Sequence, residues 1–175
     1  MLALARELVR SDEDRWLAYE LIASHAGFGR LSEHKLEELG RGVNSWWTVD
    51  AYARTLTGPA WLNGQISAQT IRRWADAPDL WWRRVALVST VALNTRSQGG
   101  PGDTVRTLAV CRRLVADRTD LVAKAMSWAL RALVPHDPRA VQRFLCQHQH
   151  EVASLVVREV TNKLRTGLKN PRRPR

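Results

Sequence analysis

The stretch Asp79-Leu-Trp-Trp-Arg-Arg-Val-Ala-Leu-Val88 decides the fold. It opens with an aspartate that can cap a helix, places a basic residue four positions later and continues as an apolar run. The same arrangement recurs at Ser11-(x3)-Arg15 and at Asp120-(x3)-Lys124. Helices of this kind are expected to start near residues 11, 44, 79, 120 and 151, at intervals of 33, 35, 41 and 31 residues. A period in this range is typical of an α-solenoid of HEAT-like helical repeats.

The rest of the chain also reads as helix, and no segment has a convincing strand pattern. Apolar spacing and capping residues predict helices over residues 15–25, 31–39, 45–57, 67–76, 80–94, 104–116, 120–134, 138–148 and 151–168. The expected N-caps are Ser32, Asn44 or Ser45, Ser67, Asp79, Asp103 and Asp137. We therefore predict an all-α repeat domain over residues 1–168, followed by a basic, disordered tail over residues 169–175.

Charge is distributed unevenly along the 175 residues. The net charge is +10 at pH 7, yet residues 1–50 carry six Lys and Arg against nine Asp and Glu. Residues 51–175 carry 21 basic against eight acidic residues, a net of +13. This asymmetry favours a polyanionic partner, most simply nucleic acid. The alternative is an arginine-rich surface that reflects codon usage.

The sequence gives no sign of export or membrane insertion. The apolar start of the chain is too short for a signal peptide, and no run approaches the roughly 20 apolar residues of a membrane span. The two cysteines, Cys111 and Cys146, lie far apart and are interpreted as reduced, buried thiols. We expect a cytoplasmic monomer with no membrane partner.

Three tryptophan clusters carry the functional signal. Trp46-Trp47-Thr48-Val49-Asp50 places an indole and a carboxylate one turn apart, so Trp46 and Asp50 share a helix face. The other two clusters are Trp81-Trp82-Arg83-Arg84 and Trp128 within Lys124-Ala-Met-Ser-Trp-Ala-Leu-Arg131. Equivalent helices of a solenoid line one concave face, so the clusters can converge across repeats. Indoles, arginines and a carboxylate together could bind a polyanion and stabilise a positive charge within it.

These clusters resemble the signatures of the DNA alkylation repair glycosylases built from HEAT-like repeats (the AlkD type). The segment from Asn44 to Asp50 is similar to that family's Trp-x-x-Val-Asp motif. Trp74 followed by residues 79–88 is similar to its second signature, and residues 124–131 followed by Asp137-Pro138 to its third. The resemblance covers about residues 11–168. Family members usually have further N-terminal helices, and position 47, often acidic there, is tryptophan in this chain.

The resemblance implies an all-helical crescent with a basic concave groove. It also implies excision of N3- and N7-alkylated purines from double-stranded DNA, without flipping the base into a pocket and without a cofactor. Asp50, Trp46 and Trp128 would be the catalytic residues.

DNA contacts are implied by the same resemblance. The candidates are Arg83, Arg84, Trp47, Lys124 and Arg131. Two consecutive helical residues point about 100° apart, so one of the two adjacent arginines is expected to face the groove and hold a phosphate. The family pattern favours Arg84.

The proposed chemistry needs little from a general acid, because an N3- or N7-alkylpurine already carries positive charge. The barrier lies in the sugar cation that remains, which a nearby carboxylate stabilises while it orients a water. Asp50 is the candidate carboxylate, and Trp46 and Trp128 offer π faces to the cation. No lysine is placed to form a Schiff base, so a glycosylase is expected to be monofunctional, without strand cleavage.

Other readings stay open. Asp50 could be a partly buried carboxylate paired with an arginine on a neighbouring helix, and Trp46 and Trp128 could be ordinary core. The protein could bind nucleic acid, or another protein, without catalysis. Packing roles are expected for Trp16, Trp61 and Trp74, whereas Trp47, Trp81 and Trp82 are ambiguous.

The segment Cys146-Gln-His-Gln-His150 places metal-ligand residue types close together. Cys146 and His150 share a helix face, and His148 does not. A structural zinc site needs four ligands, and nothing nearby in the sequence supplies them. We expect no metal.

Overall fold

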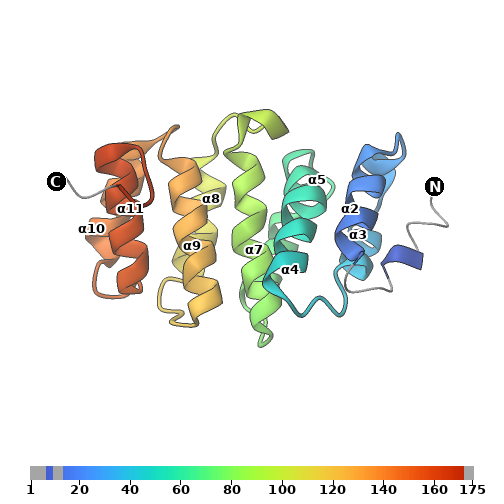
Figure 1. Cartoon of the computed structure of the whole chain (residues 1–175), viewed down its shortest axis with the longest axis horizontal. Helices are drawn as coiled ribbons and strands as arrows, with labels where there is room; N and C mark the ends of the chain where they lie inside the picture. Colours follow the sequence, from blue (N-terminus) through green and yellow to red (C-terminus); the bar gives the residue numbers. More distant parts are fainter. Residues whose placement is uncertain (1–6, 10–13, 172–175) are drawn as a thin grey trace.

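A computed structural model describes residues 7–9 and 14–171, and these form helices and connecting turns without any strand (Figure 1). The all-α prediction is confirmed. A π-helical turn, η2 (Ala53–Thr57), joins α4 to α5. The α-helices are α2 (Arg15–Ser24), α3 (Glu33–Leu39), α4 (Trp46–Tyr52), α5 (Gly58–Leu62), α6 (Ala68–Ala75), α7 (Leu80–Leu93), α8 (Thr104–Arg113), α9 (Asp120–Leu133), α10 (Pro138–His148) and α11 (Ser154–Thr166).

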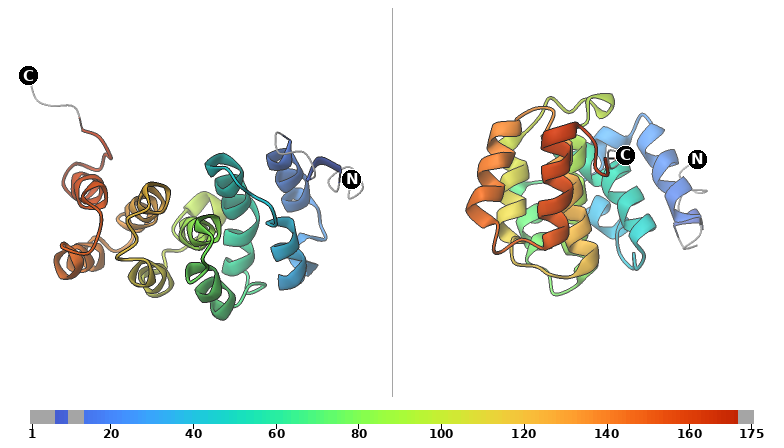
Figure 2. Two further views of the ribbon diagram at one scale, coloured as in Figure 1. Left: turned by 90° about the horizontal axis from the view of Figure 1, so that it is seen from below. Right: turned by 60° about the vertical axis from the view of Figure 1, so that its left-hand side comes forward.

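The helices stand in two layers (Figures 1 and 2). The inner layer begins with α2, which packs against α4. The continuous segment α4–η2–α5 packs against α7, α7 packs against α9, and α9 packs against α11. The outer layer contains α3, α6, α8 and α10, behind the inner layer in the view of Figure 1. Each repeat therefore touches its neighbours, as in an α-solenoid. The crescent and the basic groove remain predictions.

Side-chain hydrogen bonds between neighbouring repeats recur at one repeat length. Thr57 bonds Ser89, which is 32 residues later. Arg84 bonds Asp50 across 34 residues, and Arg113 bonds Asp76 across 37. The sequence period therefore corresponds to a physical ladder, in which a residue finds its partner about one repeat away.

Most of the predicted helix starts are confirmed by their caps. The side-chain oxygens of Ser32, Ser45, Ser67, Asp103 and Asp137 each accept a hydrogen bond from a backbone N–H three residues later. Asp79 accepts from the N–H of Trp81. Asp120 is the first residue of α9, after the N-cap Thr119. The predicted start at Ser11 lies outside the described residues.

The helix that begins at Trp46 does not end near Thr57 as predicted. It continues through η2 and α5 to Leu62, despite Gly58 and Pro59. A proline inside an α-helix lacks an N–H and clashes with the carbonyl four residues earlier, and the wider π-turn before Pro59 removes that conflict. Gly58 permits close packing, since a Cβ there would stand 2.6 Å from the Cβ of Ala92 on α7.

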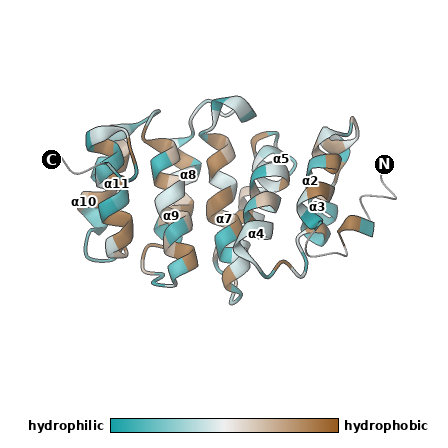
Figure 3. Cartoon of the chain, in the orientation of Figure 1, coloured by the Kyte–Doolittle hydropathy of each residue, from teal (hydrophilic) through white to brown (hydrophobic). Residues whose placement is uncertain are grey.

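Helix α7 is the centre of the core. Every residue from Arg84 to Leu93 is buried, because α7 contacts α4, α5, α6, α8 and α9. Figure 3 shows this part of α7 as mainly hydrophobic. A helix covered on all sides needs apolar residues around its whole circumference, which explains the continuous run in the sequence.

The tryptophans divide between core and surface. Trp61 and Trp74 are buried, as predicted. Trp82 packs between the rings of Tyr52 and Trp74, and Trp81 is also packed against the core. The prediction for Trp16 is wrong: its side chain is 46% exposed, because Arg15 points inward at this position of α2.

The C-terminal end of the described chain stays close to α11. The backbone carbonyl of Lys169 accepts a hydrogen bond from Asn162, and its ammonium lies 3.2 Å from a carboxylate oxygen of Glu159. Residues 172–175, the last part of the predicted tail, lie outside the described residues. Within the described part of the chain, no helix has the length and apolar character to cross a membrane.

Candidate functional site

The predicted catalytic carboxylate is held by an arginine from the next repeat. Arg84 donates two parallel hydrogen bonds to Asp50, from Nε to Oδ1 at 2.8 Å and from Nη2 to Oδ2 at 2.7 Å. Its third nitrogen, Nη1, donates to the backbone carbonyl of Leu121 in the first turn of α9. This guanidinium therefore joins α4, α7 and α9 at one point.

Burial dominates the electrostatics of this ion pair. The side chain of Arg84 is 6% exposed and that of Asp50 is 16% exposed. Burial raises the pKa of the Asp50 carboxyl above its ordinary value, and the hydrogen bonds and charge of Arg84, with a smaller effect from Arg54, oppose that rise. The carboxylate is thus fixed in direction by Arg84, and only a small part of the side chain remains open to solvent.

Trp46 lies one helical turn before Asp50 on α4. Its side chain is 58% exposed, so it is not a core residue in this structure. It is the first residue of the helix, directly after the Ser45 cap. The cap fixes where α4 begins, and the helical period then sets Trp46 and Asp50 on one face, as the sequence predicts.

Arg54, on the same helical segment, was missed by the sequence interpretation. Its guanidinium carbon stands 5.6 Å from the centroid of the Trp128 ring on α9, in cation–π contact. Its charge also acts on Asp50. The signal was available in the sequence, because Trp46, Asp50 and Arg54 follow one another at four-residue spacing.

Helix α9 contributes the third cluster. Lys124, Trp128 and Arg131 follow at helical spacing along one face, and Trp128 is half-buried. Lys124 is 51% exposed and pairs with Asp120 at 2.7 Å. Arg131 donates to Ser127, which itself donates to the buried Glu159 on α11. Burial lowers the pKa of the Arg131 guanidinium, and the charge of Glu159 opposes this.

A cleft of about 510 Å³ opens beside Trp128, between the C-terminal ends of α7 and α9 and the side of α11. Its basic lining residues are Arg96, Arg131, His136 and Lys163, and no carboxylate is among the described residues that line it. The remaining lining residues are Val91, Asn94, Thr95, Trp128, Ala132 and Pro135. The cleft therefore suits an anion, and Trp128 forms part of its lining.

The structure gives the adjacent arginines different surroundings. Arg83 bonds Asp117 at 2.8 Å and the backbone carbonyls of Ala77 and Pro78, so it fastens the turns that precede α7 and α9. Arg84 points into the site, as the family pattern favours, yet its guanidinium is engaged by Asp50 and Leu121. Trp47 is half-buried beside the site residues of α4. In this conformation neither arginine presents a free guanidinium to a phosphate.

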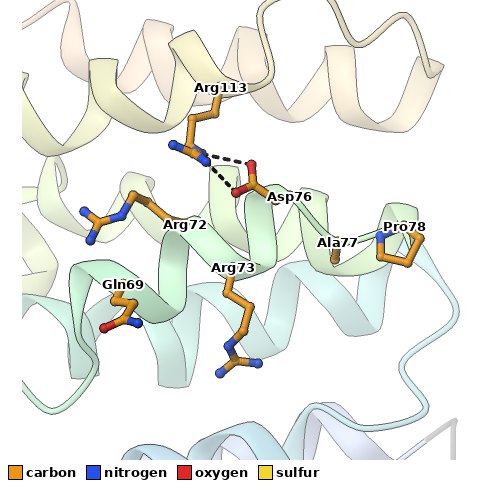
Figure 4. Close-up of a pocket in the computed structure, with 7 residues that line it drawn as sticks. All are labelled: Gln69, Arg72, Arg73, Asp76, Ala77, Pro78 and Arg113. Carbon is orange, nitrogen blue, oxygen red and sulfur yellow. Dashed lines mark hydrogen bonds and ion pairs between the residues drawn. The ribbon is translucent and has the colours of Figure 1, made fainter.

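A second hollow lies on the outer layer, at α6 and the end of α8 (Figure 4). It has a volume of about 580 Å³ and is lined by Gln69, Arg72, Arg73, Asp76, Ala77, Pro78 and Arg113. Figure 4 shows the pair between Arg113 and Asp76 at its centre. None of the predicted site residues lines this hollow.

The described residues contain no group of three His, Cys, Asp or Glu that could hold a metal ion. In the segment 146–150, His148 bonds Glu151, and its ring centroid lies 4.8 Å from that of Phe144, with the rings tilted by 48°. Cys146 is exposed, so the prediction of a buried thiol at this position is wrong. Cys111 is buried, which raises the pKa of its thiol to about 12.

The fold and the site together define an all-helical repeat protein with a partly buried carboxylate beside indoles and basic side chains. A family model described as DNA alkylation repair enzyme matches residues 1–164. The chain therefore belongs to this family, and its role lies in the repair of alkylated DNA. A comparison with curated proteins gives no significant match.

Proposed function

We propose that this protein is a monofunctional DNA glycosylase, which hydrolyses the N-glycosidic bond of cationic N3- and N7-alkylpurines in double-stranded DNA. The observation that carries the proposal is the Asp50 carboxylate, fixed by Arg84 and reachable beside Trp46 and the Arg54–Trp128 stack. Family membership supports a repair role. The choice of reaction and lesion is inferred from the chemistry of these side chains.

The chemistry follows from the charge on the lesion. When the N-glycosidic bond breaks, its electron pair goes to the purine, which leaves as a neutral base, and the sugar becomes a cation. Asp50 stabilises this cation and orients a water, whose oxygen bonds the anomeric carbon and whose proton is lost to solvent. Trp46 and Trp128 place π faces around the cation. A fixed carboxylate in a poorly hydrated site needs little rearrangement at the moment of bond cleavage.

Arg84 acts in this proposal as a positioning residue for Asp50. Buried ion pairs are weak evidence for stability, because apolar residues of similar volume often stabilise a fold as well or better. A pair that is nevertheless built across three helices, next to an exposed indole, is better explained by a need for a fixed charge. The alternative reading of Asp50 as a structural carboxylate predicts the same hydrogen bonds but no effect on base release.

DNA binding is proposed to use the cleft beside Trp128 and the exposed cations around it. Arg96, Arg131 and Lys163 line that cleft without a carboxylate among the described lining residues, which suits the phosphates of one strand. Lys124 lies on the same face of α9. These contacts would hold the duplex without reading its sequence. The lesion would stay outside any pocket, against the indoles.

A non-catalytic DNA-binding member of the family is the alternative. It is favoured by the engagement of both Asp50 oxygens by Arg84, because one hydrogen bond to each oxygen leaves fewer free lone pairs for a water or a sugar. In that case Asp50 and Arg84 only fix the geometry of the helices, and the basic cleft holds DNA without chemistry.

The test is base release from duplex DNA that contains N7-methylguanine, measured in single turnover for the wild type and for Asp50→Asn. Loss of one fixed electrostatic group lowers such rates by on the order of 10²–10³-fold. The matched control is Asp76→Asn on the outer layer, which should react like the wild type. A uracil-containing duplex should release nothing, since uracil lacks a leaving-group charge. Equal rates for Asp50→Asn and the wild type would refute the mechanism; DNA binding without release by any protein would favour the alternative.

A further inference from the structure

Arg54 differs from the other arginines of the site in how it is held. Its backbone carbonyl is fixed by a hydrogen bond from the side chain of Gln98, at 2.9 Å. Its guanidinium has no carboxylate partner among the described residues and rests on the ring of Trp128. By contrast, Arg83 and Arg84 are bound by carboxylates and backbone carbonyls. The base of the Arg54 side chain is anchored while its charged end is held by one indole.

The Arg54 guanidinium occupies the surface of Trp128 where, in the proposed reaction, the sugar cation would lie. It covers a π face of Trp128 and is close enough to Asp50 to favour the ionised carboxylate. A cationic sugar would need the same surroundings, an indole face beside a carboxylate. Two positive charges cannot share that face without repulsion, so Arg54 must leave Trp128 before a cationic lesion can use it.

We propose that Arg54 is a positioning residue that covers Trp128 in the free protein and transfers to a phosphate of the damaged strand when DNA binds. The inference deepens the proposed function and rests on it. A cation–π contact at an exposed site is weaker than a charge-assisted, bidentate bond between guanidinium and phosphate. DNA therefore draws Arg54 off the ring, and the movement uncovers Trp128 next to Asp50.

In this proposal Arg54 has one role in the free protein and another in the complex with DNA. In the free protein, Arg54 shields an indole that would otherwise face solvent. In the complex, its charge fixes a phosphate close to the lesion, and the anchored backbone at Gln98 sets how far that phosphate can stand from Asp50. The residue thereby couples backbone binding to exposure of the reacting surface.

The experiment measures binding of an undamaged duplex against salt concentration for the wild type, Arg54→Met, Arg54→Lys and Arg72→Met. Methionine keeps an apolar contact with Trp128 but removes the charge, and lysine keeps the charge. Arg72 lines the outer hollow, so Arg72→Met removes one positive charge from the opposite layer. Urea unfolding of each variant checks that the fold is intact.

Arg54→Met should bind about tenfold more weakly at low salt, and the slope of log K against log salt should fall in magnitude by about 1. Arg54→Lys should restore the slope, and Arg72→Met should leave it unchanged. A wild-type slope for Arg54→Met, or tighter binding by it, would overturn the proposal, because Arg54 would then only pack on or block Trp128. An equal loss for Arg72→Met would also overturn it. This experiment measures DNA binding and not base release. If the wild type binds DNA without releasing the base, the proposed function is wrong, but the binding data still show whether Arg54 contacts a phosphate.

Discussion

Two arginine–carboxylate pairs join neighbouring repeats with the same hydrogen-bond pattern and opposite surroundings. Arg84 and Asp50 pair in the inner layer, and Arg113 and Asp76 pair in the outer layer. In both pairs two guanidinium nitrogens face two carboxylate oxygens. The side chains of the inner pair are 6% and 16% exposed, whereas those of the outer pair are 42% and 51% exposed.

The difference shows that burial, rather than pairing, sets the properties of such a carboxylate. Burial raises the pKa of Asp50 even though Arg84 binds it, while the hydrogen bonds of Arg113 lower the pKa of the exposed Asp76. Water screens the outer pair, so it contributes little to stability or to any field beyond itself. Water screens the inner pair much less, so its electric field acts on a cation that approaches Asp50.

The largest expected difference is in stability. Arg84→Ala leaves the partly buried Asp50 without its partner and should lower the free energy of unfolding by about 3–5 kcal/mol. Arg113→Ala, at an exposed pair, should lower it by about 0–1 kcal/mol. Urea denaturation of both variants, compared by midpoint and slope, measures this. Similar losses for the two variants would mean that the inner pair is as well solvated as the outer one.

The pH dependence of base release should depend on Asp50 and not on Asp76, and this is the second largest expected difference. The pKa of Asp50 is raised above the ordinary 3.8, so the acid limb of the release rate should lie at higher pH than an ordinary aspartate would give. Single-turnover rates across the acidic range test this, and Asp76→Asn should not move the limb. A limb at the ordinary aspartate value would contradict the effect of burial on Asp50.

The same shifts have opposite effects on folding. The folded pKa of Asp50 lies above its unfolded value, so between those values the folded protein binds more protons and stability falls as pH rises. The folded pKa of Asp76 is lowered, so its stabilisation is present above the ordinary value of 3.8 and is lost as pH falls through the folded pKa. Unfolding of Asp50→Asn and Asp76→Asn against pH should therefore differ from the wild type in opposite senses in the acidic range.

The smallest expected effect concerns DNA affinity. Arg96→Gln removes one cation from the cleft beside Trp128, and the salt slope of binding should fall in magnitude by about 1. Arg112→Gln removes an exposed cation from α8 in the outer layer and should leave the slope unchanged. Fluorescence anisotropy with a labelled duplex over a salt series is sufficient. If Arg112→Gln lowers the slope and Arg96→Gln does not, the DNA binds to the outer layer instead.

Much of the fold follows from local sequence. Caps such as Ser45, Ser67 and Asp103 bond their own first turns, so three or four residues determine where the helices begin. The continuation through Pro59 could not be read locally, since η2 is stabilised by its packing on α7. The exposure of Trp16 depends likewise on which side of α2 meets the next repeat.

The site was accessible from the sequence in part. Helical spacing relates Trp46 to Asp50, but the partner of Asp50 lies on another helix. The repeat period contained that information: one repeat of 34 residues leads from Asp50 to Arg84. What the period cannot give is which of two adjacent arginines turns inward, because this depends on the rotation of α7 in its packing against α4 and α9.

In the proposed mechanism the pair between Arg84 and Asp50 provides a fixed charge, and its contribution to the stability of the fold is secondary. The most direct measurement is single-turnover release of N7-methylguanine by the double variant Asp50→Leu/Arg84→Met, whose apolar side chains replace both charges together. Such replacements are often neutral or stabilising, so the free energy of unfolding of this variant should be higher than that of the wild type or within about 1 kcal/mol of it. We expect a stable protein whose release rate is lower by on the order of 10²–10³-fold. A stable double variant that releases the base at the wild-type rate would contradict this mechanism.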